Sequence, residues 1–310
     1  MQVLTPRDVP LGGLRAMRVR RTLPQRERSL VGAWCFADHY GPDEVDDTGG
    51  MVVPPHPHTG LQTVSWLFAG EIEHRDSAGN HALVRPGELN LMTGGRGVSH
   101  SEVSTAGTTT LHGVQLWVAL PDDAREAPAD FEHYAPPVLT GPGWQASVFL
   151  GTALGHTSPV RTATPLLGAE LLLEPGTTLD LDVDDGFEHG VLLDSGSVVV
   201  AGRQVKPAEL AYVEHGRSAL RVEAVESSRL VLLGGPPFGE QIVMWWNFVG
   251  RTHDDVVRAR EEWQAQITRD GSVVTDGQDV ADGRFGIVVG DHLAPIPAPP
   301  MPTARLKPRA

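Results

Sequence analysis

Alternating apolar and polar positions dominate the first 120 residues of the chain. Over residues 61–69, the apolar Val64, Trp66 and Phe68 are separated by other side chains with the two-residue period of a β-strand. A second run of this kind covers residues 111–120. Glycines and short polar segments separate the runs, and such residues are typical of tight turns. The pattern therefore predicts an antiparallel β-domain built from hairpins.

The second half of the chain weakly repeats the first. The segment LVRPGEL at residues 83–89 matches QVKPAEL at residues 204–210, and a glycine follows each of them at Gly95 or Gly216. A similar pair, LFAG and LDSG, precedes the two segments. Internal repetition indicates two copies of one structural unit. We therefore expect two similar β-domains.

A connector rich in Pro and Gly lies between residues 121 and 143, and it divides the chain near residue 140. We assign residues 1–140 to an N-terminal domain and residues 141–292 to a C-terminal domain. The remaining residues, 293–310, are rich in proline and end in basic residues. This composition predicts an extended, poorly ordered tail.

One helix is predicted late in the chain. Thr252 can cap its N-terminus, and Asp255 three residues later completes a capping box. Gly271 is positioned to end it. One helical stripe carries the side chains expected to pack, namely Val256, Arg260, Trp263 and Ile267.

Composition and charge narrow the class of protein. The 35 Gly and 25 Pro make up about a fifth of the 310 residues, whereas their usual combined share is roughly 12%. This excess favours short strands over long helices. A formal net charge of −14 argues against binding of nucleic acid or anionic membranes. No apolar run reaches the roughly 18 residues of a membrane span, and no signal segment opens the chain. We therefore expect a cytoplasmic, monomeric protein with neither nucleic acid nor membrane as a partner.

The single cysteine, Cys35, excludes an internal disulfide and a Cys-rich metal site. Because Trp34 and Phe36 flank it, we expect a buried thiol rather than a nucleophile. Any metal site in this chain must therefore be built from histidine and carboxylate.

Two pairs of candidate metal ligands stand out among the 13 histidines and the acidic residues. His56 and His58 are two residues apart, as are His100 and Glu102, so on a strand each pair presents both side chains on one face. If the two strands are neighbours in one small barrel, three imidazoles and one carboxylate converge. This donor set suits Fe(II), Mn, Co, Ni, Cu or Zn. The glycine-rich segment before His100 allows tight turning and close backbone approach.

The other histidines are interpreted more simply. His74 lies in a polar segment that is expected to form an exposed hairpin, so we expect a solvated surface group. His39, beside Asp38, either orients a ligand imidazole or makes a loop-stabilising polar contact. The rest have no partner at metal spacing and are assigned ordinary surface or core roles: His81, His112, His133, His156, His189, His215, His253 and His292.

Four segments together resemble the pirin family of the cupin superfamily, over roughly residues 10 to 275. PHPHTGLQTV at residues 55–64 and GGRGVSHSE at residues 94–102 resemble the first and second motifs of the family. FADHYGP at residues 36–42 resembles its Phe-Leu-Asp-His-Phe-Gly-Pro signature, with Ala and Tyr substituted. WNFVGRTH at residues 246–253 is similar to a stretch common near the end of bacterial members.

This resemblance implies an all-β bicupin fold, with two stacked antiparallel β-sandwich or jelly-roll domains. It also implies one divalent metal per chain, usually iron, in the N-terminal domain. The ligands that it implies are His56, His58, His100 and Glu102.

The sequence departs from the family pattern in two places. Gln62 stands where pirins usually carry Glu, which we interpret as a change in pocket polarity rather than in metal retention. In the second copy, Asp182, Asp184 and Arg221 stand where the histidines would be, so we expect the C-terminal domain to be metal-free.

The resemblance implies two kinds of function. Some pirins have quercetin 2,3-dioxygenase activity, in which a flavonol and dioxygen react at the metal and Glu102 can act as general base. Trp66 and Phe68 could line a flat aromatic pocket for the flavonol, although we favour a role in the barrel core. Other pirins are iron-dependent regulators, and this alternative implies a protein partner. A zinc-dependent isomerase or hydrolase on the same scaffold is a weaker third hypothesis.

Overall fold

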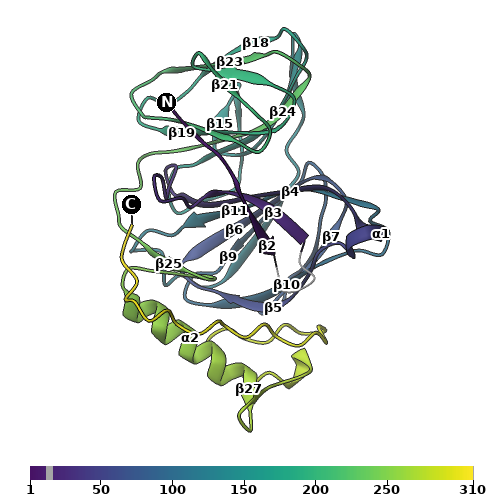
Figure 1. Cartoon of the computed structure of the whole chain (residues 1–310), viewed down its shortest axis with the longest axis vertical. Coiled ribbons are helices and arrows are strands. Elements are labelled where there is room, and N and C mark those ends of the chain that lie inside the picture. Colours follow the sequence, from purple (N-terminus) through teal and green to yellow (C-terminus); the bar gives the residue numbers. More distant parts are fainter. Residues whose placement is uncertain (12–16, 310) are drawn as a thin grey trace.

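The structure is a computed structural model that describes residues 1–11 and 17–309. Two β-domains are stacked on each other, and one long helix lies beyond the first domain (Figure 1). Each domain contains a seven-stranded and a four-stranded sheet, and all the strand pairs within these sheets are antiparallel. The predicted all-β architecture with two antiparallel domains and a C-terminal helix is confirmed.

In the first domain, the larger sheet has the order β12-β9-β6-β11-β4-β3-β2 and the smaller sheet the order β5-β10-β7-β8. The strands of the larger sheet are β2 (Arg7–Leu11), β3 (Met17–Leu23), β4 (Trp34–Glu44), β6 (Leu61–Ala69), β9 (Leu89–Thr93), β11 (Thr110–Ala119) and β12 (Asp130–Tyr134). Those of the smaller sheet are β5 (Val52–His58), β7 (Ile72–Asp76), β8 (His81–Val84) and β10 (Val98–Ser104). A short helix, α1 (Val45–Thr48), follows β4.

In the second domain, the larger sheet has the order β1-β22-β19-β24-β17-β14-β13 and the smaller sheet the order β18-β23-β20-β21. The strands of the larger sheet are β1 (Gln2–Leu4), β13 (Leu139–Gly141), β14 (Trp144–Leu150), β17 (Leu167–Leu173), β19 (Glu188–Ser195), β22 (Leu210–Val213) and β24 (Ser228–Gly235). Those of the smaller sheet are β18 (Thr178–Asp182), β20 (Val198–Val200), β21 (Arg203–Val205) and β23 (Ala219–Ala224). A two-stranded hairpin pairs β15 (Thr152–Ala153) with β16 (His156–Thr157).

Apolar side chains of the two larger sheets form a shared core between the domains. Trp66 is fully buried there, and its ring stacks on that of Phe149 with centroids 4.5 Å apart. Phe68 packs against the same core. Gly60 adopts a φ of +68°, which separates the register of β6 from that of β5 and turns these aromatic rings away from the histidine pair. Trp66 and Phe68 are therefore core residues, but of the core between the domains rather than of the interior of the first barrel.

The N-terminus crosses from one domain to the other. Residues of β1 pair with β22 of the second domain, with Gln2 opposite Tyr212 and Leu4 opposite Leu210. Figure 1 shows the N-terminus beside the second domain. The expected division at residue 140 falls within β13 of the second barrel, and β1 also belongs to that barrel.

After the second barrel, the chain returns to the first domain. The hairpin of β25 (Val243–Trp245) and β26 (Phe248–Gly250) leads into α2 (His253–Ile267). The amide of Val249 donates to the carbonyl of Thr59 at 3.0 Å, and this bond ties the hairpin to the first domain. Beyond α2 follow β27 (Thr268–Arg269), β28 (Ser272–Val273) and a 3-10 turn, η1 (Gly277–Asp279).

The predicted capping box of α2 is present. The Thr252 hydroxyl accepts from the amide of Asp255 at 3.1 Å, and the Asp255 carboxylate accepts from the amide of Thr252 at 2.9 Å. The helix ends at Ile267, before Gly271, because β27 and β28 form a hairpin there. Its buried face includes Val256, Ala259, Trp263 and Ile267.

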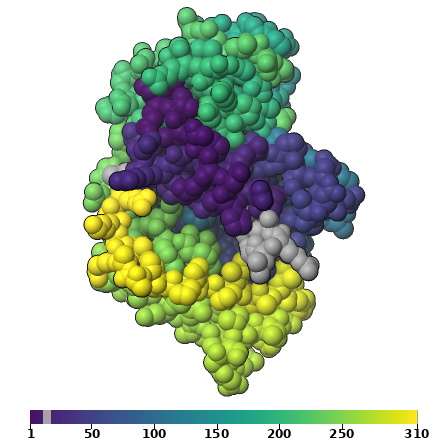
Figure 2. All heavy atoms as spheres, viewed as in Figure 1, coloured from purple at the N-terminus to yellow at the C-terminus, as the bar shows by residue number. Residues whose placement is uncertain are grey.

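The C-terminal tail is extended but packed, so the prediction of a poorly ordered segment is wrong. The indole of Trp263 donates to the carbonyl of Ile296 at 2.8 Å, and the Arg260 guanidinium donates to the carbonyl of Pro299 at 2.6 Å. Ile242 and Arg309 exchange two backbone hydrogen bonds of 2.8 Å. These bonds fix the tail to the rest of the molecule. Its prolines have no backbone N–H groups with which to form regular secondary structure. Figure 2 shows the tail in yellow, running across the surface of the molecule. No helix among the described residues is long and apolar enough to span a membrane.

Candidate metal centre

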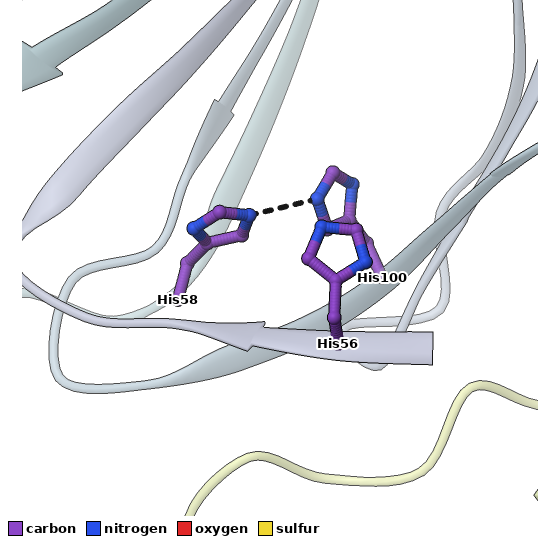
Figure 3. Close-up of side chains that lie close together, drawn as sticks. All are labelled: His56, His58 and His100. Carbon is purple, nitrogen blue, oxygen red and sulfur yellow. Dashed lines mark hydrogen bonds between the residues drawn. The ribbon is translucent and has the colours of Figure 1, made fainter. Parts of the chain in front are cut away.

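Neighbouring strands β5 and β10 bring the predicted ligands together inside the first barrel. The strands pair antiparallel, with His100 directly opposite His56. His56 and His58 point to one side of β5 because side chains two apart share a face. Figure 3 shows the two rings projecting from one strand toward the ring of His100. The period-two spacing read from the sequence therefore produces a cluster of three imidazoles.

The three imidazoles are close-packed and their ligand atoms lie within 4.8 Å of one another. The Nε2 atoms of His58 and His100 are 3.0 Å apart, and the rings of His56 and His100 have centroids separated by 4.3 Å. His56 Nδ1 donates to the carbonyl of Pro54 at 2.9 Å, which leaves its Nε2 with a free lone pair.

Burial keeps these imidazoles neutral. None of the three is more than 7% exposed. Burial lowers the pKa of His56 to about 4 and holds the pKa values of His58 and His100 well below the usual value. Neutral imidazole is the form that binds metal. Lone pairs of neutral rings that converge at such distances repel one another unless a proton or a cation lies between them, so this donor set fits a divalent metal.

Glu102 lies farther along β10, beside His100. A register shift separates the two residues, and on the β5 side Glu102 is opposite Val53 rather than His56 or His58. Its carboxylate belongs to a group with His100 and His74 whose ligand atoms lie within 4.8 Å of one another. Ser65 donates its hydroxyl to Glu102 Oε1 at 3.1 Å. Burial raises the pKa of Glu102, and the nearby His74 and the Ser65 hydrogen bond partly oppose that shift.

A cavity of about 320 Å³ opens on the three histidines and Glu102. Phe36 and Trp117, whose rings stack with centroids 3.9 Å apart and planes 11° apart, give this cavity an aromatic wall. The segment after the second barrel adds Trp246, Asn247 and Ile296 to the lining. The remaining lining residues are Pro10, Met51, Val53 and Gln115. The returning hairpin and tail therefore complete the cavity that the first barrel begins.

His74 is buried, so its assignment to the solvated surface is wrong. It lies on β7 opposite Glu102 of β10 and is 2% exposed. The turn begins only at Ser77, and Ile72, His74 and Asp76 all point into the barrel. His74 is two residues from the apolar Ile72, so on a strand both side chains share one face. This two-residue period was the signal in the sequence that could have identified His74 as buried.

His39 and His112 lie on the opposite face of the larger sheet, away from the candidate metal centre. The Nε2 atoms of both donate to Asp194 Oδ1 of the second domain, at 2.6 Å for His39 and 2.5 Å for His112. His39 therefore makes a polar contact, but between domains rather than within its loop, and it orients no candidate ligand. His112 is likewise an interface residue rather than an ordinary core or surface group.

Two further expectations concern the departures from the family pattern. Gln62 is buried, and its amide donates to the Thr93 hydroxyl at 2.9 Å. It is not among the residues that line the cavity, so the interpretation that it changes pocket polarity is wrong. Asp182, Asp184 and Arg221 of the second barrel are exposed and form no convergent group among the described residues. Cys35 is buried as expected, and burial raises its pKa to about 12.

Comparison with known proteins agrees with this architecture. A Pseudomonas aeruginosa protein with the name "putative quercetin 2,3-dioxygenase" is 40% identical, over 97% of this chain and 91% of its own length. A pirin-like protein of Caulobacter vibrioides is 36% identical, over 80% of this chain and 88% of its own. The crystal structure of a quercetin 2,3-dioxygenase from Acinetobacter baumannii matches with a TM-score of 0.88 and 36% identity, covering 98% of this chain and 96% of that one.

The family profiles match both halves of the chain. The pirin profile covers residues 15–118, and the profile of the pirin C-terminal cupin domain covers residues 168–268. The first match includes the histidine cluster, and the second covers most strands of the second barrel, whose corresponding positions carry no histidine. With two barrels, one histidine-rich cavity and relatives matched over most of their length, the chain belongs to the pirin family.

Proposed function

We propose that the protein is a metal-dependent dioxygenase of the quercetin 2,3-dioxygenase type, which cleaves a flavonol ring oxidatively with dioxygen as the second substrate. His56, His58, His100 and Glu102 would hold one divalent metal, with Fe(II) preferred and Mn, Co, Ni, Cu or Zn as alternatives. The observation that carries this proposal is the cluster of three neutral imidazoles in a cavity with an aromatic wall. The names of the Pseudomonas and Acinetobacter relatives support the choice of substrate.

The cavity suits a flat, largely apolar ligand. Its volume of about 320 Å³ lies at the lower end of the roughly 300–1,000 Å³ of small-molecule sites. Phe36 and Trp117 both line the cavity and would supply aromatic contacts to a planar ring system. Trp246 adopts a φ of +53°, an uncommon conformation for a non-glycine residue, and this places the turn with Asn247 at the cavity.

Glu102 is the group placed to accept a proton. When bound, a divalent metal supplies the Lewis acidity that favours deprotonation of the flavonol 3-hydroxyl. The Glu102 carboxylate lines the same cavity as the histidines and accepts a hydrogen bond from Ser65. A carboxylate that loosens from the metal has free lone pairs with which to accept this proton. Glu102 would therefore take the hydroxyl proton, while the aromatic and aliphatic lining excludes water.

An aerobic assay with quercetin tests the proposal. Iron-loaded protein should bleach the flavonol absorption band and release carbon monoxide, and Glu102→Gln should lower kcat by about 10²–10⁴-fold if the carboxylate is the base. His81→Ala is a matched control, because His81 is an exposed histidine of the same domain. Absence of turnover with each of the six metals, in protein that carries one equivalent of metal, would contradict the dioxygenase and favour the regulatory alternative.

A further inference from the structure

A chain of polar contacts leads from His100 away from the cavity. His100 Nδ1 lies 3.3 Å from Nδ1 of His74, and His74 Nε2 lies 3.3 Å from Oδ2 of Asp76. All three side chains are at most 2% exposed. The contacts join β10 to β7, its neighbour in the smaller sheet. None of them uses the Nε2 atom of His100, which faces His58.

Asp76 and His74 are both held in place by further contacts. Asp76 Oδ1 accepts from the amides of Ala78 and Asn80 at 2.9 and 3.0 Å, and the Asn80 side chain donates to both carboxylate oxygens. The carboxylate is therefore fixed at the base of the β7–β8 hairpin. The ring of Phe131, from β12, packs against the His74 ring with centroids 4.9 Å apart and restricts its rotation.

The contacts define one set of proton positions that is compatible with metal binding. If His100 Nε2 is a metal ligand, the proton of its neutral ring is on Nδ1, which then donates to Nδ1 of His74. His74 must accept at Nδ1 and therefore carries its own proton on Nε2, which donates to Asp76. Each N–H group in the series His100–His74–Asp76 then faces an acceptor.

We propose that His74 and Asp76 are positioning residues, which hold His100 in the tautomer and orientation that present Nε2 to the metal. This inference rests on the metal centre of the proposed function but not on flavonol turnover. Hydrogen bonds to the distal nitrogen of a ligating imidazole orient the ring and raise its basicity. His56 differs, because its Nδ1 donates to a backbone carbonyl rather than to a side chain linked to a carboxylate.

The tautomers of the wild-type protein provide the first test. Protein labelled with ¹⁵N-histidine and loaded with diamagnetic Zn²⁺ should show His100 protonated at Nδ1, and His74 protonated at Nε2 and unprotonated at Nδ1, in long-range ¹H–¹⁵N correlation spectra. A His74 ring protonated at Nδ1 would overturn the proposal. This measurement requires neither a variant nor enzymatic activity.

Zn²⁺ affinity, measured by competition with a chromophoric chelator, provides the second test. Loss of a partner of a metal ligand typically weakens binding about 10- to 100-fold, and we expect this of His74→Leu. His74→Asn keeps an acceptor near the position of Nδ1 and should recover part of the loss. His81→Ala, an exposed histidine on the same hairpin, should stay within about twofold of the wild type. Unchanged affinity in His74→Leu would contradict the positioning role.

Asp76 also stabilises its hairpin, so its variant needs a structural control. Asp76→Asn should weaken Zn²⁺ binding, whereas Asn80→Ala removes side-chain bonds of the turn but leaves the carboxylate facing His74. An equal loss of Zn²⁺ affinity in both variants would assign the effect to the hairpin and overturn the positioning role of Asp76. Full Zn²⁺ retention by the His56→Ala/His58→Ala protein would instead refute the metal centre itself, so the two failures are distinguishable.

Discussion

His39 of the first barrel and Asp194 of the second form a buried hydrogen bond across the domain interface, with Nε2 and Oδ1 2.6 Å apart. His112 donates to the same carboxylate oxygen at 2.5 Å. One carboxylate thus joins two strands of the first domain, β4 and β11, to β19 of the second. Arg229 lies 3.9 Å from the other oxygen of Asp194 and is itself paired with Glu170. The interface is therefore held by a polar cluster as well as by the apolar core.

Asp194→Asn should destabilise the protein, because the amide keeps the shape of the side chain but removes the charge that both imidazoles face. Loss of one partner from a buried, charge-assisted network typically costs about 1.5–3 kcal/mol. Equilibrium urea unfolding would measure this as a lower midpoint. Asp180→Asn, in the exposed pair with Arg221, is the matched control and should leave the midpoint unchanged. Equal midpoints for the two variants would show that the interface does not depend on this charge.

The same cluster should make stability depend on pH. Burial lowers the pKa of His39, although the hydrogen bond to Asp194 opposes this effect, and Arg20 and His112 add to the lowering. His39 is then neutral in the folded protein, whereas in the unfolded chain it binds a proton below about pH 6.5. Stability should therefore fall as the pH drops below about 6.5, because the unfolded state binds more protons.

A titration of the unfolding free energy between pH 7.5 and 5 would check this expectation. The slope should be smaller in His39→Asn than in the wild type, and His81→Ala should keep the wild-type slope. The folded-state pKa of Asp194 is also lowered: burial opposes this, but hydrogen bonds from His112 and His39 outweigh it. Its contribution has the same sign but appears only in more acidic solution, below about pH 4, where an unfolded aspartate is protonated. A wild-type slope in His39→Asn would mean that other groups carry the pH dependence.

Local patterns in the sequence predict those parts of the fold that depend on neighbouring residues. The period of two brings His56 and His58 to one face of a strand, and the Thr252–Asp255 capping box marks the start of α2. These features follow from backbone geometry over a few residues. The spacing of His100 and Glu102 also follows this rule, although a register shift displaces Glu102 from the other three side chains.

Contacts between distant segments could not be predicted in the same way. His39 and Asp194 are 155 positions apart, and nothing near either residue indicates the other. Ile296 reaches the cavity only because Trp263 and the amide–carbonyl bond to Pro55 hold the tail across the first barrel. The period of two could have placed His74 on the face of Ile72, but its contacts with β10 follow only from the pairing of β7 with β10. Tertiary packing determines each of these positions.

Removal of the predicted ligands should abolish stoichiometric metal binding. His56→Ala, His58→Ala and Glu102→Ala each remove one donor, and the histidine double variant leaves too few imidazoles to hold a divalent ion. Metal analysis of purified protein should find about one equivalent in the wild type and well below one in the variants. Added metal should also raise the Tm of the wild type but not of the double variant, since only binding to the folded state stabilises it. Glu73→Gln, on the outer side of β7, is the control.

Ile296 should affect substrate binding without affecting the metal. Its side chain lines the cavity, and its amide donates to the carbonyl of Pro55 at 2.9 Å, beside His56. Ile296→Ala keeps that backbone bond but removes apolar surface from the cavity, which should cost about 1–2 kcal/mol of binding free energy. For a flavonol substrate, this corresponds to a rise in KM of roughly 5- to 30-fold. Val289→Ala, at a site that is 74% exposed in the same segment, should leave KM unchanged. Because the four proposed ligands remain, metal content should stay at the wild-type level in both variants. An unchanged KM in Ile296→Ala would mean that the tail covers the cavity without contacting the substrate.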